Sequence, residues 1–176
     1  MKIEPFIKQF ISFCERGSID YALIGAFAMQ AYGYVRATRD IDFVVRRQSQ
    51  SKIVSHLESI GFETIHRSDG YSNHLHPVGS LRVDFVYVDD ATAEKIFAET
   101  KRVTLFKNIA VPVAKAEHLL AMKLFAAKNA PERLLRELAD IKELAKAAGI
   151  DKGILKQLFE KYGFGGRLNE VSDDKY

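Results

Sequence analysis

The stretch that decides the fold is residues 36–45, which read Arg-Ala-Thr-Arg-Asp-Ile-Asp-Phe-Val-Val. Its apolar second half predicts a β-strand over 41–45, because β-branched and aromatic residues favour strands. Asp40 and Asp42 are two positions apart, so their side chains project to one face of the sheet. Like charges at that spacing repel unless a cation lies between them, and Mg²⁺ is usually held by one or two carboxylates together with substrate phosphates. The pattern predicts a metal site; its alternative is a pair of solvated side chains where a strand begins.

A strand, a glycine and a helix precede this stretch. Residues 21–24 (Tyr-Ala-Leu-Ile) predict a short apolar strand, and Gly25-Ala26 turns it into a helix reaching about Tyr32. The first N–H groups of such a helix lack backbone partners, and they lie at the positive end of the helix dipole. We therefore expect this turn to offer backbone N–H groups to a phosphate.

A third carboxylate and several basic residues accompany the acidic pair. Asp84 lies within 82–88 (Arg-Val-Asp-Phe-Val-Tyr-Val), a predicted strand whose other residues are mostly apolar, so a carboxylate there requires a partner. Arg36, Thr38 and Arg39 precede the acidic strand, where they can neutralise phosphates or the aspartates.

Together these residues resemble the nucleotidyltransferase superfamily that shares the DNA polymerase β fold. The motif that carries the resemblance is Gly25-Ala26, Arg36-x-Thr38-x-Asp40-x-Asp42, then Asp84 in an apolar strand. The branch it is most similar to is the AbiEii-like nucleotidyltransferases, which include toxins of type IV toxin–antitoxin systems. The resemblance covers residues 20–90 well and 110–145 more loosely. It implies a small mixed β-sheet flanked by helices, two-metal catalysis and transfer of an NMP from an NTP.

The resemblance also implies roles for individual residues. Asp40, Asp42 and Asp84 would be the catalytic and metal-binding residues, with two Mg²⁺ ions, and Asp84 would help to deprotonate the acceptor hydroxyl. The nucleotide-binding set would be Gly25, Ala26, Arg36, Thr38, Arg39 and Lys123. One departure is Ala26, because the family usually has Gly-Gly or Gly-Ser here; alanine keeps the backbone N–H but loses a hydroxyl that could contact phosphate.

Lys123 and Asp140 lie in the helical last third of the chain. The helical neighbours of Lys123 three and four residues away are apolar: Leu119, Leu120, Ala126 and Ala127. A lysine on such a face is expected to be buried and to need a partner, and Asp140 is a candidate to pair with it or orient it. The alternatives are a lysine whose charged end reaches solvent at the helix edge and an aspartate on a charged surface.

The whole chain predicts an α+β protein. We expect a nucleotidyltransferase core over 1–114, a C-terminal helical subdomain over 115–164 and a loose tail over 165–176. The remaining predicted elements are helices over 5–16, 49–60 and 91–98, strands over 62–66, 103–106 and 109–113, and three helices within 115–161. The last two of these strands are expected to pair as a hairpin.

Between two of the predicted strands, residues 66–79 predict a flexible loop or irregular hairpin beside the site, able to touch a base or an acceptor. His66, His74 and His76 lie in or beside this segment. With no cysteine or third fixed ligand nearby they do not predict a zinc site, and we expect them near a substrate loop or on the surface. Cys14 shows no nucleophile motif and is expected to be a small core residue.

Composition bounds the class of protein. The chain has 176 residues, 47% hydrophobic and 28% charged, as in globular proteins rather than disordered ones. Its single cysteine excludes an internal disulfide. Its longest uncharged stretch, Tyr21–Val35, is shorter than the roughly 20 apolar residues of a membrane span, and early charges interrupt any signal peptide. We expect a cytoplasmic protein, and its net charge of +3 permits a nucleic-acid partner without requiring one.

The leading hypothesis is an Mg²⁺-dependent nucleotidyltransferase that moves an NMP from an NTP to an acceptor hydroxyl. The resemblance suggests an RNA or tRNA end, or a protein, as acceptor, and a toxin with an antitoxin protein as partner. A small molecule such as an aminoglycoside is the alternative acceptor. A degenerate nucleotide- or RNA-binding module on the same fold is a second hypothesis, supported by Ala26, and a plain protein-interaction domain is a third.

Overall fold

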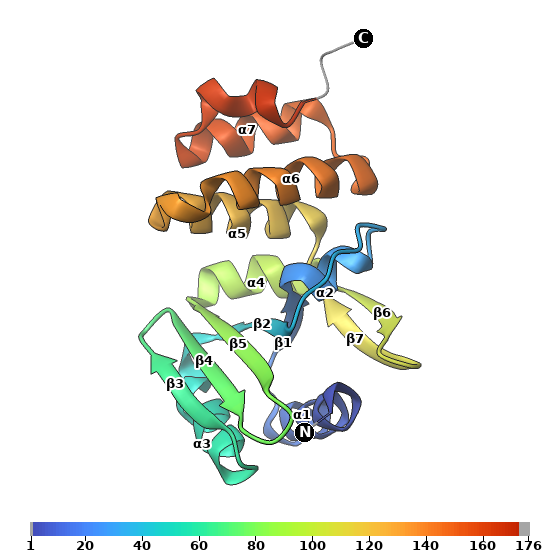
Figure 1. The fold of residues 1–176 in the computed structure, drawn as a ribbon, viewed down its shortest axis with the longest axis vertical. Coiled ribbons are helices and arrows are strands. Elements are labelled where there is room, and N and C mark those ends of the chain that lie inside the picture. The colour runs from blue at the N-terminus through green and yellow to red at the C-terminus, as the bar shows by residue number, and fades with distance from the viewer. Residues whose placement is uncertain (1, 173–176) are drawn as a thin grey trace. The chain divides into compact units, whose positions relative to one another are not determined.

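A computed structural model describes residues 2–172 of the chain. The chain forms two compact units (Figure 1). The first unit runs up to Ala31 and then over Arg36–Ala114, and it contains the sheet. The second unit comprises Tyr32–Val35 and the chain from Lys115 onward, and it is helical.

The first unit is built on a seven-stranded mixed sheet, in the order β3-β4-β5-β2-β1-β7-β6. Its strands are β1 (Tyr21–Ile24), β2 (Asp40–Arg46), β3 (Glu63–Arg67), β4 (Tyr71–His76), β5 (Leu81–Val88), β6 (Lys101–Leu105) and β7 (Ile109–Val113). The β2–β5 and β1–β7 pairs are parallel, and the other pairs are antiparallel. The sheet and its helices confirm the predicted α+β class.

One face of this sheet is closed by aromatic packing. The helices of the unit are α1 (Ile3–Gly17), α2 (Gly25–Gln30), α3 (Gln50–Ser59), which follows the 3₁₀ turn η1 (Arg47–Ser49), and α4 (Asp90–Ala98). Phe10 of α1 packs on Phe43 of β2 and Phe85 of β5, with ring centroids 4.7 and 5.4 Å away. All three side chains are buried. Because strand side chains alternate, this packing sends Asp42 and Asp84 to the opposite face.

The second unit is a set of packed helices. They are α5 (Ala116–Asn129), α6 (Leu134–Ala148) and α7 (Lys152–Tyr162), with 3₁₀ turns η2 (Pro131–Arg133) and η3 (Gly165–Glu170). Gly149 ends α6 in the left-handed conformation, φ 64°, which suits a residue without a Cβ. Residues 165–176 are predicted to be a loose tail. The structure differs from this up to residue 172, because Gly165–Glu170 form η3 and Val171 is buried. Residues 173–176 lie outside the described part.

Of the two alternatives predicted for residues 66–79, the flexible loop is wrong and the irregular hairpin agrees with the structure, because residues 71–76 form strand β4, which pairs with β3 through a register shift and with β5. His74, expected on the surface or at a substrate loop, is buried on the core face. Its Nε2 lies 2.7 Å from Ser72 Oγ, which in turn lies 2.6 Å from the Tyr87 hydroxyl. Burial of the imidazole is the main cause that lowers the pKa of His74 to about 4. Polar side chains can occupy these core positions because they satisfy one another.

Two further expectations can be compared with the fold. Cys14 is buried, which confirms the expected core position, and burial raises the pKa of its thiol to about 12. In the described part of the chain, every helix is too short or too polar to cross a bilayer.

Candidate active site

The central feature of the site is a pair of carboxylates on neighbouring strands. β2 and β5 run parallel in a register that sets Asp42 directly beside Asp84. Both side chains are half-buried and lie on the face opposite the aromatic core. Directly paired positions hold side chains within roughly 5 Å at their Cβ atoms. The fold therefore brings two acidic residues, 42 positions apart in sequence, into one small area.

Asp40 lies on the same face but is engaged differently. The register pairs it with Arg82, and its Oδ1 lies 3.7 Å from the Arg82 Nε. Within residues 2–172, no group of three or more acidic, histidine or cysteine side chains is gathered closely enough to hold a metal ion alone. The sequence-predicted set of three aspartates thus shares one face, with Asp42 and Asp84 adjacent and Asp40 paired with a guanidinium.

Two adjacent carboxylates fit the way in which Mg²⁺ is bound in proteins. The ion prefers oxygen ligands and usually takes one or two carboxylates, with water and substrate phosphates completing its shell. Two like charges at a directly paired position also disfavour the cation-free state. The donor set of Asp42 and Asp84 therefore suits a divalent cation that arrives together with a triphosphate.

The glycine turn lies against the same carboxylate pair. Gly25 follows Ile24, which pairs with Asp42, and it begins α2 with φ +66°. A Cβ at this position would collide with the carboxylate and Cβ atoms of Asp42. Only glycine satisfies both this backbone conformation and this close approach. The neighbouring Ala26 is buried, so its methyl group is directed into the protein.

The other predicted nucleotide-binding residues of this unit precede β2. Thr38 fixes the start of the strand, since its Oγ1 lies 3.3 Å from the backbone N of Asp40, which donates to it. Arg36 is half-buried and donates to the backbone oxygen of Ala37, whereas Arg39 is exposed. The three residues therefore lie next in sequence to the acidic strand, with Thr38 holding its first residue.

In the second unit, Lys123 is the centre of a buried ionic cluster. Its Nζ donates to Glu137 Oε2 at 2.9 Å and to Asp140 Oδ2 at 2.5 Å. Arg133 donates to the other oxygen of Glu137 at 2.7 Å, and the Tyr34 hydroxyl donates to Asp140 Oδ1 at 3.2 Å. Only 11% of the Lys123 side chain and 4% of the Asp140 side chain are exposed. The expected pairing of Lys123 with Asp140 is confirmed, and the alternatives of a solvent-reaching lysine and a surface aspartate are wrong.

Sequence reasoning missed three members of these arrangements. Glu137 lies three residues before Asp140, so the helical period places both on one face of α6, and that spacing was the available signal. Tyr34 and Arg82 carried no signal, because their contacts depend on the course of a short connecting segment and on the register between two strands. Tyr34 contacts Asp140 and Arg82 contacts Asp40, both of which the sequence identified, and Glu137 shares Lys123 with Asp140.

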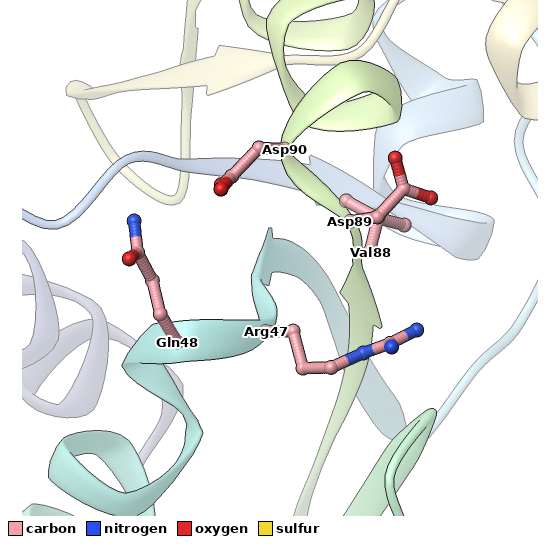
Figure 2. A pocket seen from close by; sticks show the side chains of 5 residues that line it. All are labelled: Arg47, Gln48, Val88, Asp89 and Asp90. Carbon is pink, nitrogen blue, oxygen red and sulfur yellow. The ribbon is translucent and has the colours of Figure 1, made fainter.

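A recess of about 370 Å³ occurs elsewhere in the first unit (Figure 2). It is lined by Arg47, Gln48, Val88, Asp89 and Asp90, at the ends of β2 and β5 and the start of α4. Asp89 caps the start of α4 by accepting from the backbone N–H of Thr92, and Asp90 accepts from Arg46 at 3.1 Å. Both carboxylates therefore make contacts that stabilise the fold. Val88 lies four residues from Asp84 on one strand, a separation of ~13 Å. The recess is therefore distinct from the carboxylate pair.

The comparison with protein families identifies the relationship. A family model described as nucleotidyl transferase AbiEii toxin, type IV TA system, matches residues 14–172. The chain belongs to the AbiEii nucleotidyltransferase family. This membership confirms the resemblance predicted from the motif and shows that the chain is a nucleotidyltransferase.

Solved structures support the AbiEii assignment at the level of the fold. The solution structure of the antibiotic-resistance factor ANT(2'')-Ia matches with a TM-score of 0.69, 12% identity and coverage of 89% of both chains. The lincosamide adenylyltransferase LnuA with bound lincomycin matches with a TM-score of 0.55 and 18% identity, over 82% of this chain and 97% of that one. A nucleotidyltransferase-like protein from Paracoccidioides brasiliensis matches with a TM-score of 0.53 and 15% identity, over 96% and 92%. No curated protein sequence matches the chain.

Proposed function

We propose that this AbiEii family member transfers an NMP from an NTP to a hydroxyl of an RNA end, using a Mg²⁺ site built on Asp42 and Asp84. The observation that carries the proposal is the register of β2 and β5, which sets these two carboxylates side by side on the face away from the core. Asp40 joins them on that face and is proposed as the third acidic residue of the site, serving a second ion.

The reaction forms one bond and breaks one. The acceptor oxygen bonds to the α-phosphorus, the bond from that phosphorus to the oxygen bridging the β-phosphate breaks, and pyrophosphate leaves. The acceptor hydroxyl loses its proton, and we propose that the Asp84 carboxylate helps to take it. Magnesium bound at Asp42 and Asp84 would supply positive charge for the attacking and leaving oxygens. The residues of the chain orient the reactants around it.

The nucleotide side of the site is proposed to be the glycine turn. Gly25 lies against Asp42, and Gly25 and Ala26 are proposed to present backbone N–H groups to the triphosphate. Loss of a hydroxyl at Ala26 removes a side-chain contact but leaves this backbone contact available. Arg36, Thr38 and Arg39 are proposed to neutralise and position the phosphates.

Lys123 and Asp140 are proposed as supporting residues. The Lys123 ammonium is held by two carboxylates, so its proposed contact with the triphosphate requires one carboxylate to be exchanged for a phosphate oxygen. Asp140, together with Glu137, is proposed to keep the ammonium in place until then.

The acceptor and the biological role are proposed with the family as support. Membership supports a toxin with an antitoxin protein as partner. We further propose that it acts in the cytoplasm, on RNA, tRNA or a protein. A specific observation favours a second candidate: solved structures of the same fold include ANT(2'')-Ia with adenylyl-2''-tobramycin and LnuA with lincomycin. An antibiotic is therefore the alternative acceptor, although identities of 13% and 18% establish the fold alone.

The test is to incubate the protein with each labelled NTP and Mg²⁺, together with total RNA, lysate protein, or an aminoglycoside or lincosamide. We expect label on a defined RNA and none with Asp42→Asn, while Asp90→Asn, an exposed acid outside the site, serves as the matched control. Transfer at the wild-type rate by Asp42→Asn would contradict the assignment. Mg²⁺-dependent NTP binding without transfer to any acceptor would instead favour the degenerate binding module.

A further inference from the structure

The positions of the site residues across the sheet determine the side from which an acceptor approaches. Residues paired across adjacent strands follow one another in the order Asp42, Asp84, Asn73 and His66, on β2, β5, β4 and β3. Gly25 lies against Asp42 at the other end of this row. An in-line displacement places the attacking oxygen opposite the leaving pyrophosphate. With the triphosphate at Gly25, as the proposed function has it, the acceptor comes over Asp84 from the side of β4 and β3.

A pair of stacked aromatic rings lies on that side. Tyr71 of β4 stacks on His66 of β3, with ring centroids 4.7 Å apart and an angle of 16° between the rings. Tyr71 also pairs with Val86 of β5, on the face of β5 that carries Asp84. Tyr71 is 48% exposed and Val86 36% exposed, whereas Phe85, between Asp84 and Val86, is fully buried. These residues continue the carboxylate face outward to the edge of the sheet.

We propose that this Tyr71–His66 platform binds a base of the acceptor, which is therefore the single-stranded end of an RNA. Nucleobases stack on aromatic side chains that lie exposed on the face of a sheet, and every base has a face that can do so. The half-buried Asn73, between the platform and Asp84, offers an amide that can donate to and accept from a base edge.

The spacing of the strands agrees with this role. His66 is two strand spacings from Asp84, about 10 Å, and Val86 is one side-chain repeat along β5, about 7 Å. The platform is thus far enough from the carboxylate pair for a base to stack while a hydroxyl of the same RNA end reaches Asp84. The proposal rests on the proposed function, because it takes the site at Asp42 and Asp84 as given.

The side chains of the platform favour RNA over an aminoglycoside as the acceptor. An aminoglycoside carries several ammonium groups and calls for carboxylates, whereas Tyr71, His66 and Asn73 carry none. Arg82, 50% exposed and paired with Asp40, lies on the same face and can meet a phosphate of the RNA backbone. Arg82 is four residues from Val86 along β5, ~13 Å, so the stacked rings and the arginine can contact a base and a backbone phosphate of one RNA strand.

The experiment uses a short single-stranded RNA oligonucleotide with 2-aminopurine near its acceptor end, whose fluorescence is quenched when the base stacks. The chain has no tryptophan, so the protein contributes little competing signal. We expect wild-type protein to quench the probe, Tyr71→Ala to lose the quenching and raise the KM for RNA about tenfold or more, and Tyr71→Phe to retain most of it. Binding of NTP with Mg²⁺ is expected to be unchanged in Tyr71→Ala.

Ile65→Ala is the matched control, because Ile65 is 55% exposed on β3 next to His66 but belongs to neither ring of the platform. Thermal unfolding of each variant establishes that it is folded. Unchanged quenching in Tyr71→Ala, or an equal loss of quenching in Ile65→Ala, would overturn the platform. The proposed function would remain intact as long as the wild type transfers label to RNA. Transfer to an antibiotic or protein alone would likewise overturn only the RNA acceptor. Failure of the proposed function would give a different result: either no acceptor becomes labelled, or Asp42→Asn still transfers the label.

Discussion

Gly25 lies so close to Asp42 that a single added carbon would displace the carboxylate of the aspartate. The contact joins the turn between β1 and α2 to the acidic strand, and Ile24 and Asp42 are paired across the two strands. The glycine also has φ +66°, a conformation that other residues rarely adopt. Two separate physical requirements therefore fall on one position.

Gly25→Ala is expected to abolish most nucleotide transfer, because its Cβ would push the Asp42 carboxylate away from Asp84. Gly149→Ala is the matched control: Gly149 has nearly the same φ, 64°, but nothing lies within 4 Å of its added Cβ. Both variants should lose about 1 kcal/mol of stability from the backbone strain. Only Gly25→Ala should lose activity, and equal activity in the two variants would show that the close approach to Asp42 is unimportant.

Asp84→Asn is expected to lose transfer and yet to be slightly more stable than the wild type in the absence of divalent cations. The substitution removes one of two like charges at directly paired positions, so the free energy of unfolding should rise by roughly 0.2–1 kcal/mol. Mg²⁺ added together with an NTP should raise the melting temperature of the wild type but not that of Asp84→Asn. Asp90→Asn, which loses an exposed ion pair with Arg46, should keep the response to Mg²⁺. A wild type whose melting temperature does not respond to Mg²⁺ in the presence of an NTP would contradict the metal site.

Much of the sheet could be predicted from the sequence because its signals were local. An apolar run, a glycine and an apolar strand with two aspartates gave β1, α2 and β2, and an alternating run gave β5. β4 could not be predicted as a regular strand, because its buried positions are Ser72 and His74 rather than apolar residues. Those side chains are stable in the core through their hydrogen bonds to each other and to Tyr87 and Thr64, and such bonds exist only once three strands have assembled.

The candidate site was predictable in its residue types but not in its pairings. Alternation of side chains along a strand places Asp40 and Asp42 on the same face of β2 and places Asp84 on one face of β5. The side-by-side position of Asp42 and Asp84 depends on the register of β2 and β5, which no local pattern specifies. Likewise, a buried Glu137 cannot be told from a solvated one until α6 packs on α5 and presents it to Lys123.

Lys123→Met is expected to destabilise the protein by about 3–5 kcal/mol, because it leaves Glu137 and Asp140 buried without the cation that joins them. Urea unfolding measures the loss. Lys128→Met, an exposed lysine on the same helix, should change stability little. Adding Glu137→Gln to Lys123→Met should recover part of the loss, and a Lys123→Met protein as stable as the wild type would mean that the cluster carries no net attraction.

The buried His74 should make stability depend on pH in a defined window. Burial is the main cause that lowers its pKa from 6.5 to about 4, while Glu58 acts in the opposite direction and Arg67 in the same one. Between these two values the unfolded chain takes up a proton at this histidine and the folded protein does not, so the free energy of unfolding falls as the pH drops from about 6.5 to about 4. The contribution lost is roughly 3 kcal/mol, and it does not grow further below that window.

The measurement is the free energy of unfolding against pH for the wild type, His74→Gln and His66→Gln, with the imidazole resonances followed by NMR. His74→Gln should flatten the slope between pH 6.5 and 4, because the group that titrates differently in the two states is gone. His66→Gln, at an exposed histidine, should keep the wild-type slope. A His74 resonance that titrates near pH 6.5 in the folded protein would show that burial does not keep the ring neutral, and the slope would then have to come from other groups.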